Sequence, residues 1–206
     1  MRRLSTRTAL AVIISLLLAV GLVLFCVRYF VYGGQWATFP SNSHIYAGGV
    51  LQSGSVVDRD GDSLLKIKDG IWIYSDNASV RKGTLHCVGD SGGNIATGAV
   101  TAFADKITGW NWFDGLYGSG GEVKLTIDDT VCAAAYDALA GRNGTVGVYN
   151  YKTGDIICLV SSASWDPNEG TSSADGVYIN RLLSATFVPG SVFKTVTAGA
   201  ALSNMD

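Results

Sequence analysis

A serine and a lysine three residues apart lie near the C-terminus, Ser191 and Lys194 within the stretch FVPGSVFKTVTAGAAL. On a helix this spacing places the two side chains on one face, so that the amine could accept the proton of a nucleophilic hydroxyl. The pattern alone decides little, because Ser-x-x-Lys occurs three times in the chain, at residues 63–66, 79–82 and 191–194. The surroundings of each serine must therefore separate a nucleophile from chance.

The residues around Ser191 favour a catalytic interpretation. Pro189 and Gly190 interrupt the preceding structure and allow a tight turn, so Ser191 is expected at or near the first turn of a helix. Free N–H groups and the positive end of the helix dipole at that point would favour an oxyanion. Lys194 can accept the proton only where burial lowers its pKa and so favours its neutral form. Its apolar neighbours could provide that burial: Val192, Phe193 and Val196. The alternative is a serine that caps a helix and a solvated lysine.

Other kinds of chemistry have little support. His44 and His86 are the only histidines, so a Ser-His-Asp triad is poorly supported, and no Cys or His pair has the spacing of metal ligands. Cys26 lies in an apolar segment, and the three other cysteines, Cys87, Cys132 and Cys158, are expected to be small buried hydrophobic residues. We expect no metal and no cofactor.

Charge and hydropathy indicate an anchored protein that does not bind nucleic acid. Residues 8–27 form an uncharged apolar run long enough to cross a bilayer as a helix. Three arginines precede this run and only Arg28 follows closely, which predicts a cytoplasmic N-terminus and a single-pass protein with the bulk of the chain outside. A cleaved signal peptide is the alternative, although the run is long and bulky aromatic residues follow it. Residues 33–206 carry 11 Lys and Arg against 17 Asp and Glu, so no basic patch is available for phosphates.

Residues 45–121 predict a small, mostly β region. Runs such as GSVVD, GIWIYS and LHCVG alternate with turns such as DRDGD, DSGGN and GSGG. One helical stretch, TGAVTAFADKITGW, leads into a group of aromatic residues that we expect to pack in the core: Trp110, Trp112, Phe113 and Tyr117.

From residue 122 the pattern predicts a second unit of mixed α and β structure. EVKLTID indicates a strand, Asp128 or Asp129 is placed to cap a helix over TVCAAAYDALAG, and Gly141 is placed to end it. GTVGVYNYKTGDIICLVSS predicts a hairpin that turns at residues 150–154 and buries one face. A loop, SWDPNEGTSSADG, then leads to the final helix, so that the segments make the first layers of an α+β sandwich.

The order of these segments resembles that of the monofunctional, class B-like penicillin-binding proteins, the membrane-anchored D,D-transpeptidases that cross-link peptidoglycan. GSVVDRDGDSLL is similar to the start of their non-catalytic domain, and RKGTLHCVGDSGGNIATG and ITGWNWFDGLYG are similar to its later segments. VKLTIDDTVCAAAYDALAGRNGTVGVYNYKTGDIICLVSSASWDPN resembles the start of their transpeptidase domain. The most specific segment is NRLLSATFVPGSVFK, because Pro-Gly-Ser-x-Phe-Lys is far rarer than Ser-x-x-Lys. By this resemblance Ser191 is the acylated serine and Lys194 is its base.

The resemblance implies an α+β fold in three parts. Residues 1–32 would be a cytoplasmic stub and transmembrane anchor, residues 33–121 a small, mostly β non-catalytic pedestal domain, and residues 122–206 the first part of the transpeptidase α+β sandwich. Only 12 residues follow Lys194, so we expect a truncated chain that lacks the later catalytic motifs and is inactive by itself.

Two further strings match the partner motifs of Ser-x-x-Lys in this family, Ser75-Asp76-Asn77 and Lys152-Thr153-Gly154. In the family both partner motifs follow the serine, whereas here both precede it. Circular permutation could explain this order, but the surrounding segments match in the usual order. We therefore assign neither string to the active site.

The function implied is a serine acyl-enzyme D,D-transpeptidase of the cell membrane. Its partners would be peptidoglycan stem peptides, β-lactams as inhibitors, and other cell-wall synthesis proteins. A β-lactam sensor or a β-lactamase-related acylase would use the same two residues. A membrane-tethered module without catalysis is the third hypothesis.

Overall fold

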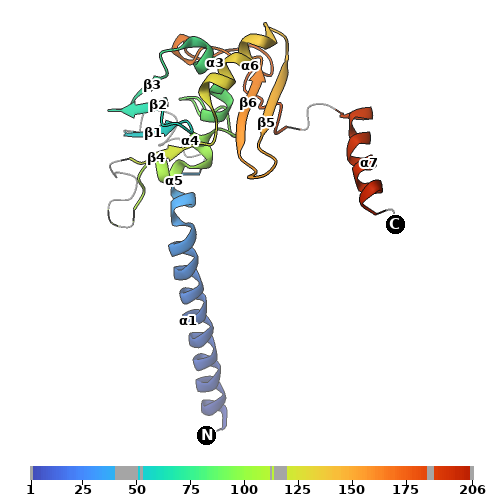
Figure 1. The fold of residues 1–206 in the computed structure, drawn as a ribbon. Helices are drawn as coiled ribbons and strands as arrows, with labels where there is room; N and C mark the ends of the chain where they lie inside the picture. The colour runs from blue at the N-terminus through green and yellow to red at the C-terminus, as the bar shows by residue number, and fades with distance from the viewer. Residues whose placement is uncertain are drawn as a thin grey trace.

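The computed structural model describes residues 2–39, 51, 53–111, 113, 120–184 and 188–204. Helix α1 (Arg2–Ala37) is one long apolar helix that projects from the folded body (Figure 1). Its segment Ser5–Ala37 is long and apolar enough to cross a membrane, which extends the predicted span of residues 8–27 in both directions. The end of α1 contacts the body, where Gly34 lies so close to Asp105 that an added Cβ would be 3.2 Å from the Asp105 Cβ.

The first sheet has the strand order β3-β2-β1-β4. Its strands are β1 (Ser53–Val57), β2 (Ser63–Lys68), β3 (Ile71–Tyr74) and β4 (Glu122–Lys124). The first three strands form an antiparallel meander, and β4 adds to the free edge of β1 in parallel. In β2, Leu65 and Ile67 are buried and Lys66 and Lys68 are exposed, as the alternation of a strand with one solvated face requires. The predicted strand-turn-strand in GSVVDRDGDSLL is confirmed.

Helix α3 (Ala78–Val88) corrects one prediction, because LHCVG is helical and was expected to be a strand. Asn77 caps the helix by accepting hydrogen bonds from the N–H groups of Ser79 and Val80. The helix packs against β2, α6 and β6, and its Leu85 and Val88 are completely buried. This three-sided packing outweighs the weak strand propensity of the segment.

The predicted helical stretch near residue 100 is two short helices, α4 (Ala99–Ala102) and α5 (Ala104–Ile107), separated at Phe103. Of the four aromatic residues after it that were expected in the core, the structure describes Trp110 and Phe113. Phe113 is 97% exposed and Trp110 is half-buried, so the packing prediction is wrong for Phe113. Trp112 and Tyr117 lie outside the described residues.

The second unit contains helix α6 (Asp129–Leu139) and a hairpin of β5 (Gly144–Tyr149) and β6 (Ile156–Ser162). The side chain of Asp128 accepts a hydrogen bond from the Val131 N–H, so this residue is the predicted cap. Ala140 occupies the left-handed position at the end of the helix, with φ of 48°, one residue before the expected Gly141. The two strands pair antiparallel with the turn at the predicted residues.

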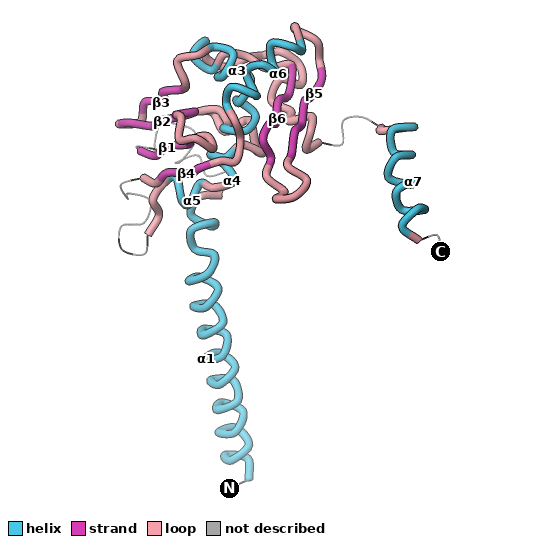
Figure 2. Tube along the Cα trace, viewed as in Figure 1, coloured by secondary structure: helices cyan, strands magenta, loops and turns pink. Residues whose placement is uncertain are grey.

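Helix α3 connects the two units, because it contacts β2 of the first sheet and β6 of the hairpin (Figure 2). Beyond β6 the chain forms a loop with one short helix, η1 (Pro167–Glu169), and then the turn η2 (Gly190–Phe193) and helix α7 (Lys194–Ser203). β4 pairs with β1, and α3 contacts β6, so contacts join residues on both sides of the expected boundary at residue 121. The position of this boundary stays a prediction.

Candidate active site

Ser191 lies in the 3-10 turn η2, which continues directly into α7 at Lys194. Gly190 has a φ of 56°, in the left-handed region that favours glycine, so the Pro-Gly pair makes the tight turn that the sequence predicts. The N–H of Val192 bonds to the carbonyl of Pro189 at 3.2 Å and closes this turn. The local structure therefore places the serine just before an α-helix that begins at the lysine.

The environment of this turn is open. Every side chain described from Val188 to Asn204 is exposed, and α7, drawn in red, stands apart from the body in Figure 1. The apolar neighbours that could bury the lysine are themselves open to solvent: Val192 is 74% exposed, Phe193 56% and Val196 58%. The described residues thus do not provide the burial on which the proposed role of Lys194 as a base depends.

The other two Ser-x-x-Lys sites have structural roles or an unsuitable geometry. Ser63 and Lys66 lie on β2, and residues three apart on a strand point to opposite faces. Ser79 begins α3 and its hydroxyl donates to the Asp137 carboxylate at 2.9 Å, which holds α3 on α6. Ser63 thus has the wrong geometry, and the hydroxyl of Ser79 is already engaged with a carboxylate.

The two strings that match the partner motifs, residues 75–77 and 152–154, also have local structural roles. Asn77 is the cap of α3, and the carbonyls of Ser75 and Asp76 accept hydrogen bonds from the guanidinium of Arg81. Lys152 and Thr153 lie in the exposed turn of the β5–β6 hairpin, where the Thr153 hydroxyl donates to Asp155 at 2.7 Å. These residues stabilise a helix start and a turn.

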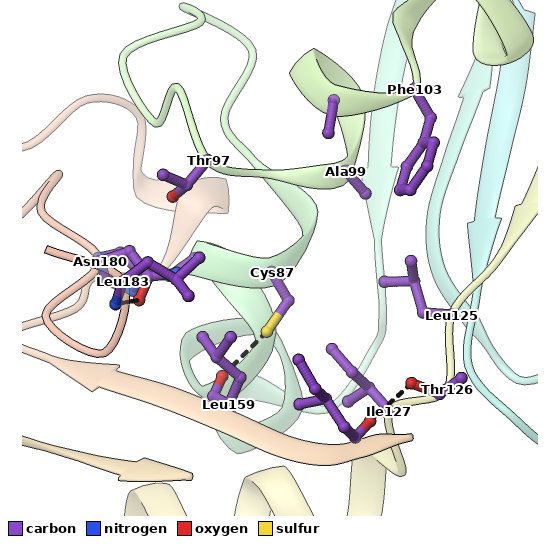
Figure 3. Close-up of a pocket in the computed structure, with 13 residues that line it drawn as sticks. Cys87, Thr97, Ala99, Phe103, Leu125, Thr126, Ile127, Leu159, Asn180 and Leu183 are labelled. Carbon is purple, nitrogen blue, oxygen red and sulfur yellow. Dashed lines mark hydrogen bonds between the residues drawn. The ribbon is translucent and has the colours of Figure 1, made fainter. Parts of the chain in front are cut away.

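A pocket of about 160 Å³ opens between α3, α4, β6 and the segment that follows β4 (Figure 3). Its walls are mainly apolar, and Ser191 is not among the residues that line it. In Figure 3, Phe103 and Leu125 lie on one side of the hollow and Asn180 and Leu183 on the other. The structure therefore does not bring the predicted nucleophile into this pocket.

Two buried polar side chains line the same pocket. His86 is fully buried and its Nε2 lies 2.8 Å from the carbonyl of Val177, which can only accept, so Nε2 carries the proton and Nδ1 is left as an acceptor. Burial lowers the pKa of His86, so the ring is neutral. Within the described part of the chain, His86 Nδ1 and Asn180 Nδ2 have no hydrogen-bond partner. Their arrangement supplies one acceptor and one donor, but no nucleophile.

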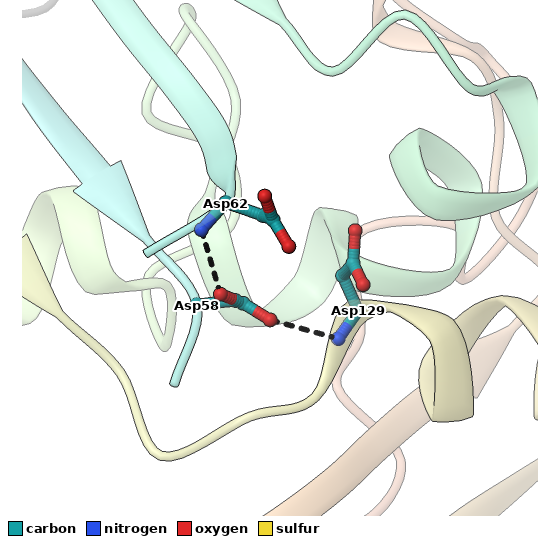
Figure 4. A group of neighbouring side chains, drawn as sticks. All are labelled: Asp58, Asp62 and Asp129. Atoms are coloured by element: carbon teal, nitrogen blue, oxygen red, sulfur yellow. Dashed lines mark hydrogen bonds between the residues drawn. The ribbon is translucent and has the colours of Figure 1, made fainter. Parts of the chain in front are cut away.

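Three carboxylates form a cluster at the turn between β1 and β2 and the start of α6 (Figure 4): Asp58, Asp62 and Asp129. One oxygen atom from each lies within 4.8 Å of the others, a spacing that a cation could bridge. Asp58 is 1% exposed, and its Oδ1 accepts N–H groups of the turn at 2.8 to 2.9 Å. Burial and the two neighbouring carboxylates raise the pKa of Asp129. Because Asp58 accepts these hydrogen bonds, the cluster has a structural role: it holds the DRDGD turn in place.

Sequence reasoning missed His86 as a buried polar residue and the contact between Asp58 and Asp129. A signal for the aspartates was present, because an Asp-x-Asp-Gly-Asp turn offers side-chain acceptors to its own N–H groups. The burial of His86 was missed because LHCVG was expected to be a strand, and a strand places its side chains on different faces from those of the observed helix.

Comparison with known proteins identifies the last part of the chain. Residues 144–205 match the model of the penicillin binding protein transpeptidase domain. This match contains the β5–β6 hairpin, the turn η2 and α7, and it includes the Pro-Gly-Ser-x-Phe-Lys segment.

Relatives and solved structures agree with this match. The chain is 30% identical to penicillin-binding protein PbpB of Mycolicibacterium smegmatis over 77% of its own length and 24% of the relative. It is 34% identical to the peptidoglycan D,D-transpeptidase PbpA of the same organism, over 45% of this chain and 23% of that protein. The crystal structure of the D,D-transpeptidase domain of a peptidoglycan glycosyltransferase from Eggerthella lenta superposes with a TM-score of 0.54 at 25% identity, covering 73% of this chain and 37% of that one. The chain thus spans about a quarter of the length of these curated relatives. By sequence and fold together, the chain is similar to the penicillin-binding proteins, and its residues 144–205 match their transpeptidase domain.

Proposed function

We propose that this chain is part of a peptidoglycan D,D-transpeptidase in which Ser191 is the acylated nucleophile and Lys194 its base. The observation that carries the proposal is the Pro-Gly-Ser-x-Phe-Lys segment, which lies inside the matched region at residues 144–205 and at a tight turn before a helix. The names of the relatives, a penicillin-binding protein and a peptidoglycan D,D-transpeptidase, support the same activity.

In the proposed reaction the Ser191 hydroxyl attacks the carbonyl of the penultimate D-Ala of a stem peptide. Lys194 accepts the hydroxyl proton, and the terminal D-Ala leaves as the free amino acid. The amine of a neighbouring stem peptide then takes the acyl group from the serine. The Ser191 N–H would be one of the donors to the oxyanion, and β-lactams would acylate the same oxygen.

The test is labelling by a fluorescent penicillin of the protein expressed from its own gene in its own membranes. We expect Ser191→Ala and Lys194→Ala to abolish the labelled band. The chain offers matched controls in its other Ser-x-x-Lys sites, because Ser79→Ala and Lys82→Ala should label like the wild type. Labelling that survives Ser191→Ala would refute the assignment.

For the 206-residue chain by itself, we expect no adduct at a useful rate. Ser191 and Lys194 are exposed, so no burial in the described structure favours the neutral form of the lysine that must accept the hydroxyl proton. Mass spectrometry after incubation with benzylpenicillin checks this expectation. A stoichiometric adduct on Ser191 would show that the turn and helix suffice for acylation.

Two alternatives keep the fold and differ in the fate of the acyl group. A β-lactam sensor or a β-lactamase-related acylase would use Ser191 and Lys194 in the same roles, and turnover of the acyl-enzyme within seconds would favour the hydrolase. The exposure of α7 favours, as a third candidate, a membrane-tethered module that performs no chemistry. Wild-type membranes that contain the stable protein without any penicillin label would support the module.

The single apolar helix at the N-terminus supports a membrane location. We further propose that the N-terminus is cytoplasmic, because Arg2, Arg3 and Arg7 precede the helix, and that cell-wall synthesis proteins are partners. Protease added outside intact cells should then digest residues after α1 and leave the helix protected.

A further inference from the structure

Three cysteines from three different elements meet in one apolar cluster. Cys87 lies on α3, Cys132 on α6 and Cys158 on β6, and all three are buried free thiols. They pack with Ile127, Leu159 and Val160 in the core between the helices and the hairpin. The sequence prediction of buried hydrophobic residues is confirmed, but it did not anticipate that the thiols would be neighbours.

Two of these thiols contact each other. The N–H of Asp128 bonds to the carbonyl of Ile157 at 2.9 Å, which fixes the start of α6 beside the residue that precedes Cys158. Cys132 follows one helical turn later and packs in the same buried cluster as Cys158, whose thiol donates to the carbonyl of Val146 at 4.0 Å. A hydrogen bond from Cys132 to the Cys158 sulfur accounts for the opposite directions in which the pKa values of the two thiols move. The Cys87 thiol instead donates to the carbonyl of Leu159 at 2.9 Å.

The pKa shifts of the three thiols set Cys132 and Cys158 apart from Cys87. The hydrogen bond from Cys132 lowers the pKa of Cys158, because the donated S–H stabilises the Cys158 thiolate, and the same bond with burial raises the pKa of Cys132. Burial also raises the pKa of Cys87, which leaves it a poor nucleophile. Of the three thiols, Cys158 is therefore the one whose pKa is lowered, and Cys132 is its neighbour in the same cluster.

We propose that Cys132 and Cys158 are a redox modification site, at which an intramolecular disulfide joins α6 to β6. The oxidant is a disulfide of a small thiol or of a thiol oxidoreductase. The Cys158 thiolate attacks one sulfur of the oxidant and releases the first thiolate, which leaves a mixed disulfide on Cys158. Cys132 loses its proton and attacks the Cys158 sulfur, which releases the second thiolate. Two electrons pass from the cysteine pair to the oxidant, which becomes two thiols.

The bond fits the packing of the elements. A disulfide has an S–S length of about 2.0 Å, so two sulfurs already in hydrogen-bond contact need a shift of roughly one or two ångströms. Because both thiols are 0% exposed, exchange with an oxidant requires the hairpin to open or must precede the packing of α6. Oxidation should therefore be faster during refolding than in the folded protein.

The test uses the full 206-residue chain, refolded in detergent from urea in a buffer of reduced and oxidised glutathione. Alkylation in denaturant followed by mass spectrometry should find two reactive thiols in place of the four cysteines of the reduced chain. Peptide mapping without reductant should find Cys132 linked to Cys158. Dithiothreitol should restore all four thiols and lower the thermal midpoint by roughly 5 to 10 °C, because a disulfide restricts the unfolded chain.

The third cysteine supplies the matched control. Cys87→Ser should still lose two thiols on oxidation, whereas Cys132→Ser and Cys158→Ser should lose none. Four reactive thiols after refolding of the wild type, or a linkage through Cys87, would overturn the proposal. The mapping of the wild-type chain decides the matter even where a variant fails to fold.

Discussion

The ion pair between Arg81 and Asp166 is predicted to be a main stabilising contact of the body. Arg81 on α3 makes a two-pronged contact with the carboxylate, Nε to Oδ1 at 2.8 Å and Nη2 to Oδ2 at 2.6 Å. Its Nη1 also donates to the carbonyls of Ser75 and Asp76 at 2.9 and 2.8 Å. The two side chains are only 12% and 7% exposed. The contact therefore joins the start of α3 to the loop that follows β6.

The perturbation is Arg81→Met, which keeps an apolar chain of similar length and removes the charge. Asp166 would then stay buried with the Asn168 N–H, at 3.0 Å, as its described hydrogen-bond donor. Breaking a buried pair in this way costs about 3–5 kcal/mol, whereas an exposed pair contributes about 0.2–1 kcal/mol. Because some water reaches the guanidinium, we expect the lower end of the first range, about 3 kcal/mol.

Urea unfolding of the full chain in detergent, followed by tryptophan fluorescence, measures this change. Trp165 is 9% exposed, precedes Asp166 and lies 4.9 Å from the Tyr178 ring, so it should report the loss of this contact. Lys82→Met, which removes a neighbouring charge without a direct hydrogen bond to the carboxylate, should cost less than about 1 kcal/mol.

The double variant Arg81→Met with Asp166→Leu should recover part of the loss, because no unpaired carboxylate is then buried. The pH dependence supplies a second readout. The hydrogen bond from Arg81 holds the pKa of Asp166 below the ordinary aspartate value of 3.8, so this stabilisation is present above that pH and is lost as the pH falls through the folded pKa. Arg81→Met should shift acid unfolding to higher pH. A loss below about 1 kcal/mol, or a double variant no more stable than the single one, would refute the reasoning.

Three further changes test the packing. Burial lowers the pKa of His86 from 6.5, so the folded protein binds fewer protons than the unfolded chain. The protein should therefore lose stability as the pH falls below about 6.5. Thermal midpoints should show this loss in the wild type and not in His86→Gln. Gly83→Ala places a Cβ 2.8 Å from the carbonyl oxygen of Cys132 and should destabilise the chain by about 1–3 kcal/mol in urea unfolding, whereas Gly199→Ala, with nothing within 4 Å, should not. Leu85→Ala should cost about 3–5 kcal/mol in the same assay, because the side chain is completely buried, and a cost below about 1 kcal/mol would contradict that burial.

Local signals in the sequence predicted several elements well. The apolar run before Arg28 is helical, and its length and composition, which suffice to cross a membrane, can be read from the sequence alone. The cap at Asp128 and the hairpin turn at residues 150–154 were predictable for the same reason, since each depends on residues within a few positions. The Pro-Gly-Ser-x-Phe-Lys segment likewise favours Ser191 among the three serines from neighbouring residues alone, and its role as the nucleophile stays a prediction.

Contacts between distant segments were not predictable in this way. The segment of Leu85 to Val88 is helical because α6, β2 and β6 surround it, and no local pattern records those neighbours. The pair of Arg81 and Asp166 spans 85 positions, and the contact of Cys132 with Cys158 depends on how α6 packs on β6.

By itself the sequence determined the long apolar helix, the hairpin and the candidate nucleophile, because each is encoded by neighbouring residues. Only the tertiary structure decided that Lys194 is exposed, that His86 is buried with an unpaired nitrogen and that two thiols touch. Burial and pairing are set by which surfaces the folded chain brings together, and these surfaces come from residues far apart in the sequence.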